Sequence, residues 1–211
     1  MPFFGTLGGA SNRGFRGYGA TAGQRAIFGY GESSSYLSMT NLVSNTGVVS
    51  TDTTGVGTAR GYLAAAGYGT DKAIFGYGVA ALSKTTTNLV SNTGVVSTDT
   101  TGVGTARVGL AAAGYGTDKA LFGYGYTIGM VSMTNLVSNT GVVSTDTTGV
   151  GTARRYLAAA GYGTDKALFG YGSTGTATAI TNLVSNTGVV STNTTGVGTA
   201  RMGLAAASYG T

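Results

Sequence analysis

The chain has 211 residues, enough for one sizeable core or a ring of small repeated units, but too few for several complex domains. Only 9% of the residues are charged and 39 are glycine, so the polar surface comes largely from Thr, Ser and Asn, a composition that favours association. The lack of Cys and His excludes disulfides, thiolate metal sites and the usual general base, and the formal net charge of +5 is spread along the chain without a basic stripe.

Residues 1–24 are rich in glycine and precede the repeated part of the chain. They lack the basic segment and apolar stretch of a signal peptide, and no run approaches the roughly 18 apolar residues of a membrane-spanning helix. We therefore expect neither a signal peptide nor membrane insertion. We predict instead an N-terminal arm that contacts another subunit, with Phe3, Phe4 and Arg13 as its anchors.

From Arg25 onward the sequence repeats every 47 residues, as the string "KAIFGYG" at 72–78 shows by recurring with small changes at 25, 119 and 166. A fixed period of roughly 20 to 50 residues indicates a repeat architecture. We therefore treat residues 25–211 as one repeated domain. Its four units are 25–71, 72–118, 119–165 and 166–211.

Each unit contains four short apolar segments bounded by Gly, Asn and Asp, which favour strands joined by hairpins. Around the second unit these segments are 87–91, 95–100, 109–115 and 119–124. Four strands per unit are typical of a β-propeller blade. We predict an all-β protein, a β-propeller with four repeat-encoded, four-stranded antiparallel blades and room for a fifth, partial blade. A β-solenoid is the main alternative.

The repeated text resembles a kelch repeat: "TAR-x-x-LAAAGYGTDKAIFGYG" followed by "TNLVSNTGVVSTDT" has a basic residue before the first strand and an apolar second strand. The family's double glycine is interrupted at Gly76-Tyr77-Gly78, and Val95-Val96 replaces the Trp of its fourth strand. The resemblance covers residues 25–211 and implies a propeller. The repeats and the leader are also similar to uncharacterised repeat proteins of tailed bacteriophages, which implies a place in a virion.

Four eight-residue windows differ most between units, and the direction of the chain predicts that all lie at one end of the sheets: 32–39, 79–86, 126–133 and 173–180. Variation on one face of a repeat protein indicates binding, although neutral drift in solvent loops is the alternative. The apolar residues that we expect to anchor a partner are Tyr36, Leu37, Tyr126, Ile128 and Met130.

One repeat position at the same end holds an arginine in all four units: Arg60, Arg107, Arg154 and Arg201. A ring of guanidinium groups could bind an anion. We favour a structural role in which each arginine pairs with the residue eight positions earlier. That residue is Asp52, Asp99 or Asp146 in the first three units and Asn193 in the last.

No combination of residues indicates catalysis: "GVGTAR" lacks the Lys-Ser/Thr ending of a phosphate loop, and Glu32 is the only glutamate. We expect no enzyme activity, cofactor, metal or nucleic-acid partner. We predict a structural or adhesive component of a larger assembly, a phage virion or tail protein, whose partners are other subunits and a host-surface glycan or protein. The alternatives are a lectin-like propeller that binds carbohydrate and an adaptor in the cytoplasm.

The two ends of the repeated part predict how the ring closes. The chain ends on a first strand that lacks its second strand, and the first unit begins at a second strand. We therefore expect residues 201–209 to pair with the sheet of residues 25–54.

Overall fold

The computed structural model describes residues 25–209, and this part of the chain is built from short β-strands and loops. It contains no helix, and hence none that could cross a membrane. The all-β prediction is therefore confirmed for the described residues. The predicted anchors Phe3, Phe4 and Arg13 lie outside them. The strands are β1 (Ala26–Gly29), β2 (Thr40–Val43), β3 (Ala64–Tyr68), β4 (Lys72–Gly76), β5 (Thr87–Val90), β6 (Ala111–Tyr115), β7 (Lys119–Tyr126), β8 (Met130–Val137), β9 (Ala158–Tyr162), β10 (Lys166–Gly170) and β11 (Thr181–Val184).

The strands form small antiparallel sheets that repeat one pattern: β3-β4-β5, β6-β7-β8 and β9-β10-β11, with β1-β2 as a two-stranded sheet. Each three-stranded sheet combines the last strand of one unit with the first two of the next. Its first hairpin is tight because Gly69 and Thr70 both have positive φ, 59° and 70°. The register is the same throughout, and the fully buried Ile74 pairs with Ala66 on one side and Leu89 on the other.

The predicted fourth strand is an irregular edge segment. In the second unit it meets β5 through an isolated bridge between Val90 and Val96. Ser97 donates its backbone N–H to the carbonyl of Leu89, while its hydroxyl accepts the N–H of the same Leu89 at 3.0 Å. A side chain thus replaces one rung of the backbone ladder, and this explains why no regular strand forms there.

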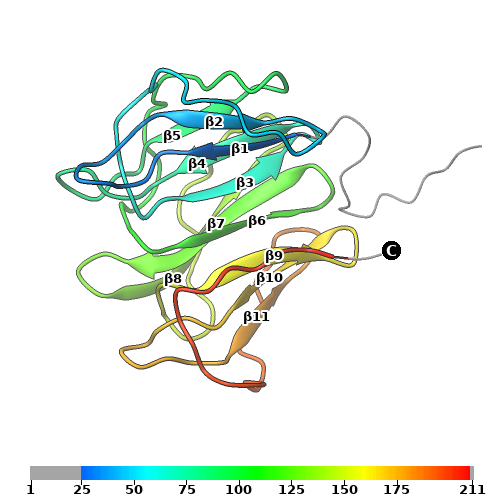
Figure 1. Cartoon of the computed structure of the whole chain (residues 1–211). Helices are drawn as coiled ribbons and strands as arrows, with labels where there is room; N and C mark the ends of the chain where they lie inside the picture. Colours follow the sequence, from blue (N-terminus) through cyan, green and yellow to red (C-terminus); the bar gives the residue numbers. More distant parts are fainter. Residues whose placement is uncertain (1–24, 210–211) are drawn as a thin grey trace, which may run out of the picture.

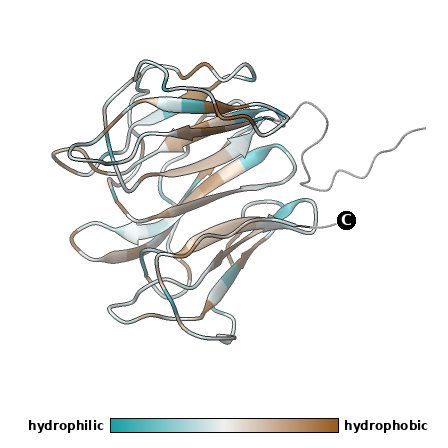
Figure 2. Ribbon diagram, in the orientation of Figure 1, coloured by the Kyte–Doolittle hydropathy of each residue, from teal (hydrophilic) through white to brown (hydrophobic). Residues whose placement is uncertain are grey.

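The sheets lie face to face in a row that follows the sequence, from β1-β2 at one end to β9-β11 at the other (Figure 1). Hydrophobic residues run along the strands of the sheets (Figure 2). The core consists of layers between neighbouring sheets. In two of them Tyr77 packs on Phe122 and Tyr124 packs on Phe169, with ring centroids 5.1 and 5.0 Å apart. Such tilted aromatic contacts add specificity to the burial of apolar surface.

The end of the described chain does not pair with β1, contrary to our expectation for residues 201–209. β1 forms a ladder with β2 alone among the described strands. The N–H of Gly203 donates to the carbonyl of Tyr156, and the hydroxyl of Ser208 donates to the carbonyl of Gly161, both at 2.8 Å. The terminal segment therefore continues the row beside β9, in the place where the next unit would begin.

Candidate functional site

Three of the four repeated arginines lie fully buried at the junctions between sheets: Arg60, Arg107 and Arg154. Arg107 shows the geometry. Its Nε donates to the carbonyl of Tyr124 at 2.9 Å, Nη1 donates to the carbonyl of Thr105 at 3.1 Å, and Nη2 donates to Oδ1 of Asn135. Its guanidinium lies 4.3 Å from the ring centre of Tyr77 in the preceding sheet. These arginines therefore join neighbouring sheets, and their donors are used within the protein.

The prediction that each arginine pairs with the residue eight positions earlier was wrong. Arg60 pairs with Asp99, and Arg107 with Asp146, each at 3.7 Å, so the carboxylate belongs to the following unit. The segment that carries each arginine crosses to the next sheet. Asp52, eight residues before Arg60, stays with its own unit and accepts a hydrogen bond from Nδ2 of Asn41 at 2.8 Å.

The third junction has no carboxylate, because Asn193 stands at the Asp position. Its Oδ1 accepts the N–H of Thr152 at 3.0 Å, and its Nδ2 donates to Oγ1 of Thr152. Nη2 of Arg154 donates to the carbonyl of Phe169 at 3.4 Å, and Oδ1 of Asn182 is buried without a hydrogen-bond partner. One of the three junctions thus forms around a buried arginine without an ion pair.

Burial dominates the electrostatics of these junctions. It lowers the pKa of Arg107 against the opposing effects of Tyr77 and Asp146, and it raises the pKa of Tyr77 to about 12. Burial also acts to raise the pKa of Asp99, but hydrogen bonds from Thr58 and other neighbours outweigh it and hold the pKa below its usual value. The carboxylate is therefore charged and oriented at neutral pH.

The four variable windows lie at the same end of the sheets as the arginines. After three of the arginines, the next residue forms an isolated β-bridge with the first residue of a window. These bridges join Gly61 to Val79, Val108 to Tyr126 and Arg155 to Ser173. In the first window, the carbonyl of Leu37 accepts the N–H of Arg60 at 3.3 Å. The windows therefore lie on one face of the described chain, as the direction of the chain predicted.

The expected anchors in these windows differ in exposure. Ile128 is 100% exposed at the tip of the β7-β8 hairpin, whereas Tyr36, Leu37, Tyr126 and Met130 are half-buried. Tyr126 is covered because it pairs with Met130 across the hairpin and lies under the guanidinium of Arg155, 4.6 Å from its ring centre. Leu82, which we did not predict, is 74% exposed in the second window.

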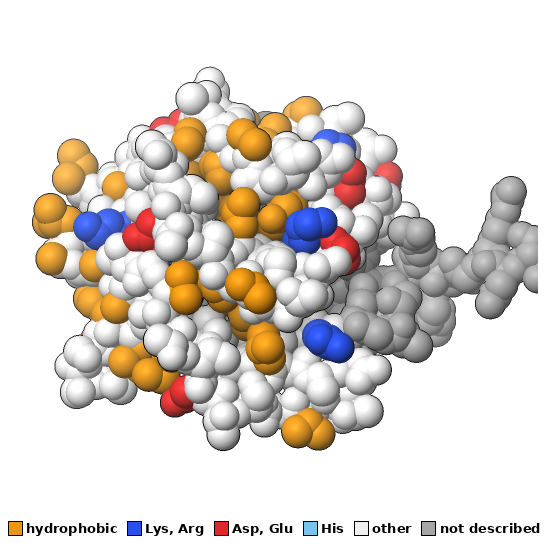
Figure 3. All heavy atoms as spheres, turned by 90° about the horizontal axis from the view of Figure 1, so that it is seen from above, with side chains coloured by type: hydrophobic (Ala, Val, Ile, Leu, Met, Phe, Trp, Pro, Cys, Tyr) orange, Lys and Arg blue, Asp and Glu red, His pale blue; other side chains and the backbone are white. Residues whose placement is uncertain are grey.

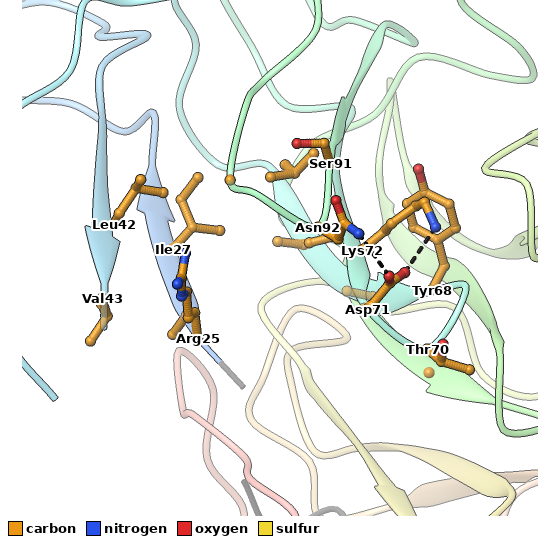
Figure 4. Close-up of a pocket in the computed structure, with 18 of the residues that line it drawn as sticks. Arg25, Ile27, Leu42, Val43, Tyr68, Thr70, Asp71, Lys72, Ser91 and Asn92 are labelled. Carbon is orange, nitrogen blue, oxygen red and sulfur yellow. Dashed lines mark hydrogen bonds and ion pairs between the residues drawn. The ribbon is translucent and has the colours of Figure 1, made fainter. Parts of the chain in front are cut away.

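A hollow of about 990 Å³ lies at the opposite end of the sheets, lined by the repeated tight turns (Figure 4). Asp71 accepts hydrogen bonds there from Nζ of Lys72 at 2.8 Å and from Nδ2 of Asn92 at 3.2 Å. The hydrogen bond to Lys72 lowers the pKa of Asp71 and raises the pKa of Lys72. The hollow was not predicted from the sequence. The repeated Asp-Lys pairs and the Asn of each "NTG" turn were the available signal.

The repeats contribute equivalent positions to this hollow: Gly67, Gly114, Gly161 and Ser208. Arg25 and Ile27 of the first unit line it as well, so residues of all four sheets contribute to the same hollow. The chain matches no protein-family model and no curated protein.

Proposed function

We propose that the chain is a β-propeller of kelch-like blades that serves, without catalysis, as a structural or adhesive component of a larger assembly. The shared hollow supports the propeller, because the innermost strands of such a fold line a common axis. Gly67, Gly114 and Gly161 stand at equivalent places around the hollow, and small residues there allow the backbones to approach closely.

One observation carries the function: the stacking of a buried arginine on a tyrosine recurs at every described junction, while the loops at one end of the sheets vary. Each buried guanidinium lies 4.3 Å from a tyrosine ring at all three junctions. The four windows differ in nearly every residue and expose apolar groups such as Leu82 and Ile128. A rigid repeated scaffold that displays variable loops on one face is suited to recognition.

The partners that we propose are neighbouring subunits of the assembly and a host-surface glycan or protein. We propose a virion as the setting of this assembly, a proposal supported by the resemblance of the repeats to uncharacterised repeat proteins of tailed bacteriophages. Only 9% of the residues in the chain are charged, and many are Thr, Ser or Asn. This composition suits close packing between subunits.

Exchange of the four windows for one Gly-Ser-Thr sequence of equal length tests this proposal. We expect the fold to persist, because the windows contribute little to the buried layers, and binding of the labelled chain to host cells or purified particles to fall. The matched control replaces four exposed valines of the opposite end with serine: Val48, Val95, Val142 and Val189. Equal binding by the parent and the window variant would contradict the proposal.

The hollow favours a second candidate, a lectin-like propeller. Asp71, Lys72 and Asn92 present a carboxylate, an ammonium and an amide at its wall (Figure 4). These groups match sugar hydroxyls, which donate and accept hydrogen bonds. Glycan-array binding that disappears in an Asp71→Ala, Asn92→Ala variant and survives exchange of the windows would support this candidate over the first.

A further inference from the structure

Every junction between units is built from two complementary halves. The earlier unit supplies a tyrosine, a threonine and an arginine, and the later unit supplies a phenylalanine, an asparagine and an aspartate or asparagine. At the second junction the N–H of the threonine donates to the carboxylate at 3.0 Å, and the tyrosine and phenylalanine ring centres are 5.1 Å apart. The residues of this junction are Tyr77, Thr105 and Arg107 on one side and Phe122, Asn135 and Asp146 on the other.

The β1-β2 end of the row presents the second half, and no described sheet precedes it. Phe28 is 62% exposed, although its counterpart Phe122 is fully buried. Nδ2 of Asn41 donates to Asp52 at 2.8 Å, as Nδ2 of Asn135 donates to Asp146 at 2.9 Å. The half-junction is therefore already formed. Figure 3 looks onto the molecule from above and shows hydrophobic side chains near the middle of this face, with charged groups scattered around them.

The opposite end of the described row presents the first half, and no described sheet follows it there. The guanidinium of Arg201 lies 4.2 Å from the ring centre of Tyr171, and its Nη1 donates to the carbonyl of Thr199 at 3.2 Å. Both contacts repeat those of the buried arginines. Val197 is 76% exposed, whereas its counterpart Val150 is half-buried.

The two ends match in shape and charge. At internal junctions the phenylalanine of the later unit covers a glycine of the earlier one, and a Cβ at Gly123 would lie 2.5 Å from the ring of Phe169. Gly170 has no aromatic atom within 4 Å of its Cβ position, so it leaves room for a ring such as that of Phe28. Arg201 at one end is opposite in charge to Asp52 at the other.

A second copy fits these ends better than closure of the chain on itself. The ends lie at opposite limits of the row of sheets (Figure 1). The arginine-to-tyrosine distance is 4.3 Å at all three junctions, so bending the row until its ends met would disturb three equivalent contacts. Another copy can reach either end with every junction intact.

We propose that the C-terminal end of one copy receives the N-terminal end of a second copy and forms a fourth junction of the same kind. Arg201 of one copy lies between its own Tyr171 and the Asn41 and Asp52 of the other, and Phe28 covers Gly170. A head-to-tail contact of this kind builds rings or filaments. The inference names a second copy as one neighbouring subunit of the proposed assembly and rests on that proposal only for its biological setting.

Charge reversal at the two ends tests the contact by sedimentation velocity across a range of concentrations. The parent chain is expected to associate as its concentration rises. Asp52→Arg or Arg201→Glu alone sets like charges against each other and should raise the Kd of association by about 100-fold. In an equimolar mixture of the two variants, each contact between unlike copies again joins opposite charges, so association should return.

Phe28→Ser removes the apolar part of the contact, and Val142→Ser is its control because Val142 is about equally exposed but lies in a turn away from both ends. Only the first should weaken association. Circular dichroism checks that each variant folds, and the window exchange should leave association unchanged. A parent that stays monomeric at high concentration overturns the inference. So does a mixture of the charge variants that fails to associate, since that result shows that association does not bring Arg201 of one copy to Asp52 of another.

Discussion

Replacement of Arg107 by methionine should destabilise the chain strongly, because this side chain joins two sheets. The substitution keeps a long side chain with apolar character and removes the charge and every donor. Three hydrogen bonds disappear, to Tyr124, Thr105 and Asn135, together with the ion pair to Asp146. The substitution therefore weakens the second junction and leaves the hydrogen bonds between strands within each sheet intact.

The magnitude follows from burial. The guanidinium is fully buried, so the acceptors that lose it have no ready access to water. Removal of one partner of a buried, hydrogen-bonded ion pair costs about 3 to 5 kcal/mol. Loss of the stacking contact with Tyr77 adds to this cost, and the apolar methionine offsets part of it. We expect the free energy of unfolding to fall by about 3 kcal/mol.

The chain contains its own control for this experiment. Arg201 occupies the same repeat position, stacks on Tyr171 and donates to the carbonyl of Thr199, but it is exposed and no described sheet follows it. Arg201→Met should therefore change the free energy of unfolding by less than about 0.5 kcal/mol at concentrations where the chain is monomeric. The pair of variants separates the junction from the local environment of the arginine.

Urea unfolding followed by circular dichroism measures both variants. Because units in a repeat array unfold with limited cooperativity, the transition of Arg107→Met should also broaden or split as the junction weakens. Equal losses in the two variants would refute the reasoning, since the cost would then arise from local contacts that both arginines share. A loss below about 1 kcal/mol for Arg107→Met would refute it as well.

Three other substitutions test the junctions. Although burial acts to raise the pKa of Asp146, hydrogen bonds to its carboxylate lower it overall. Asp146→Asn should therefore cost about 1 kcal/mol at pH 7, and this deficit should disappear as the pH falls through the lowered pKa, as urea unfolding at pH 7 and below pH 3 would show. Asn193→Asp should instead stabilise the third junction at pH 7, raising the melting temperature. Gly123→Ala should cost about 2 kcal/mol because its Cβ would meet the ring of Phe169, whereas Gly170→Ala, with no atom closer than 3.3 Å, should leave the melting temperature nearly unchanged.

The sequence was sufficient to predict the strands because their residues repeat with the pattern of a half-buried sheet. Residues 119–124 were expected as a strand and lie within β7, with Leu121 and Phe122 in the core. The turn at Gly69 was predictable from its "GTD" composition. The irregularity of the fourth segment could not be predicted, because "VVSTDT" has strong strand propensity. Only the packed structure shows that the hydroxyl of Ser97 accepts a hydrogen bond from the N–H of Leu89.

The partners of the arginines could not be predicted from one chain of near-identical units. The repeat places one aspartate before Arg60 or Arg107 in its own unit and another in the next unit, and spacing alone cannot distinguish them. The choice depends on where the segment after Val56 crosses to the following sheet, and that crossing brings Arg60 to Asp99. The exposure of individual residues in the windows could not be predicted either, because the longer β7-β8 hairpin covers Tyr126 while it exposes Ile128.

The repeat itself explains how one molecule could combine the proposed assembly and the proposed recognition. Each unit carries both halves of a junction on the faces of its sheets, so a row of units always ends in two unpaired and complementary halves, here Phe28 and Asp52 at one end and Arg201 at the other. The variable windows lie at the ends of the strands, away from those faces. A change at Leu82 or Ile128 therefore alters the proposed recognition surface without touching the Arg, Tyr and Phe contacts that hold the row together. This separation accounts for the Arg, Tyr and Phe contacts that recur at every junction while the windows diverge.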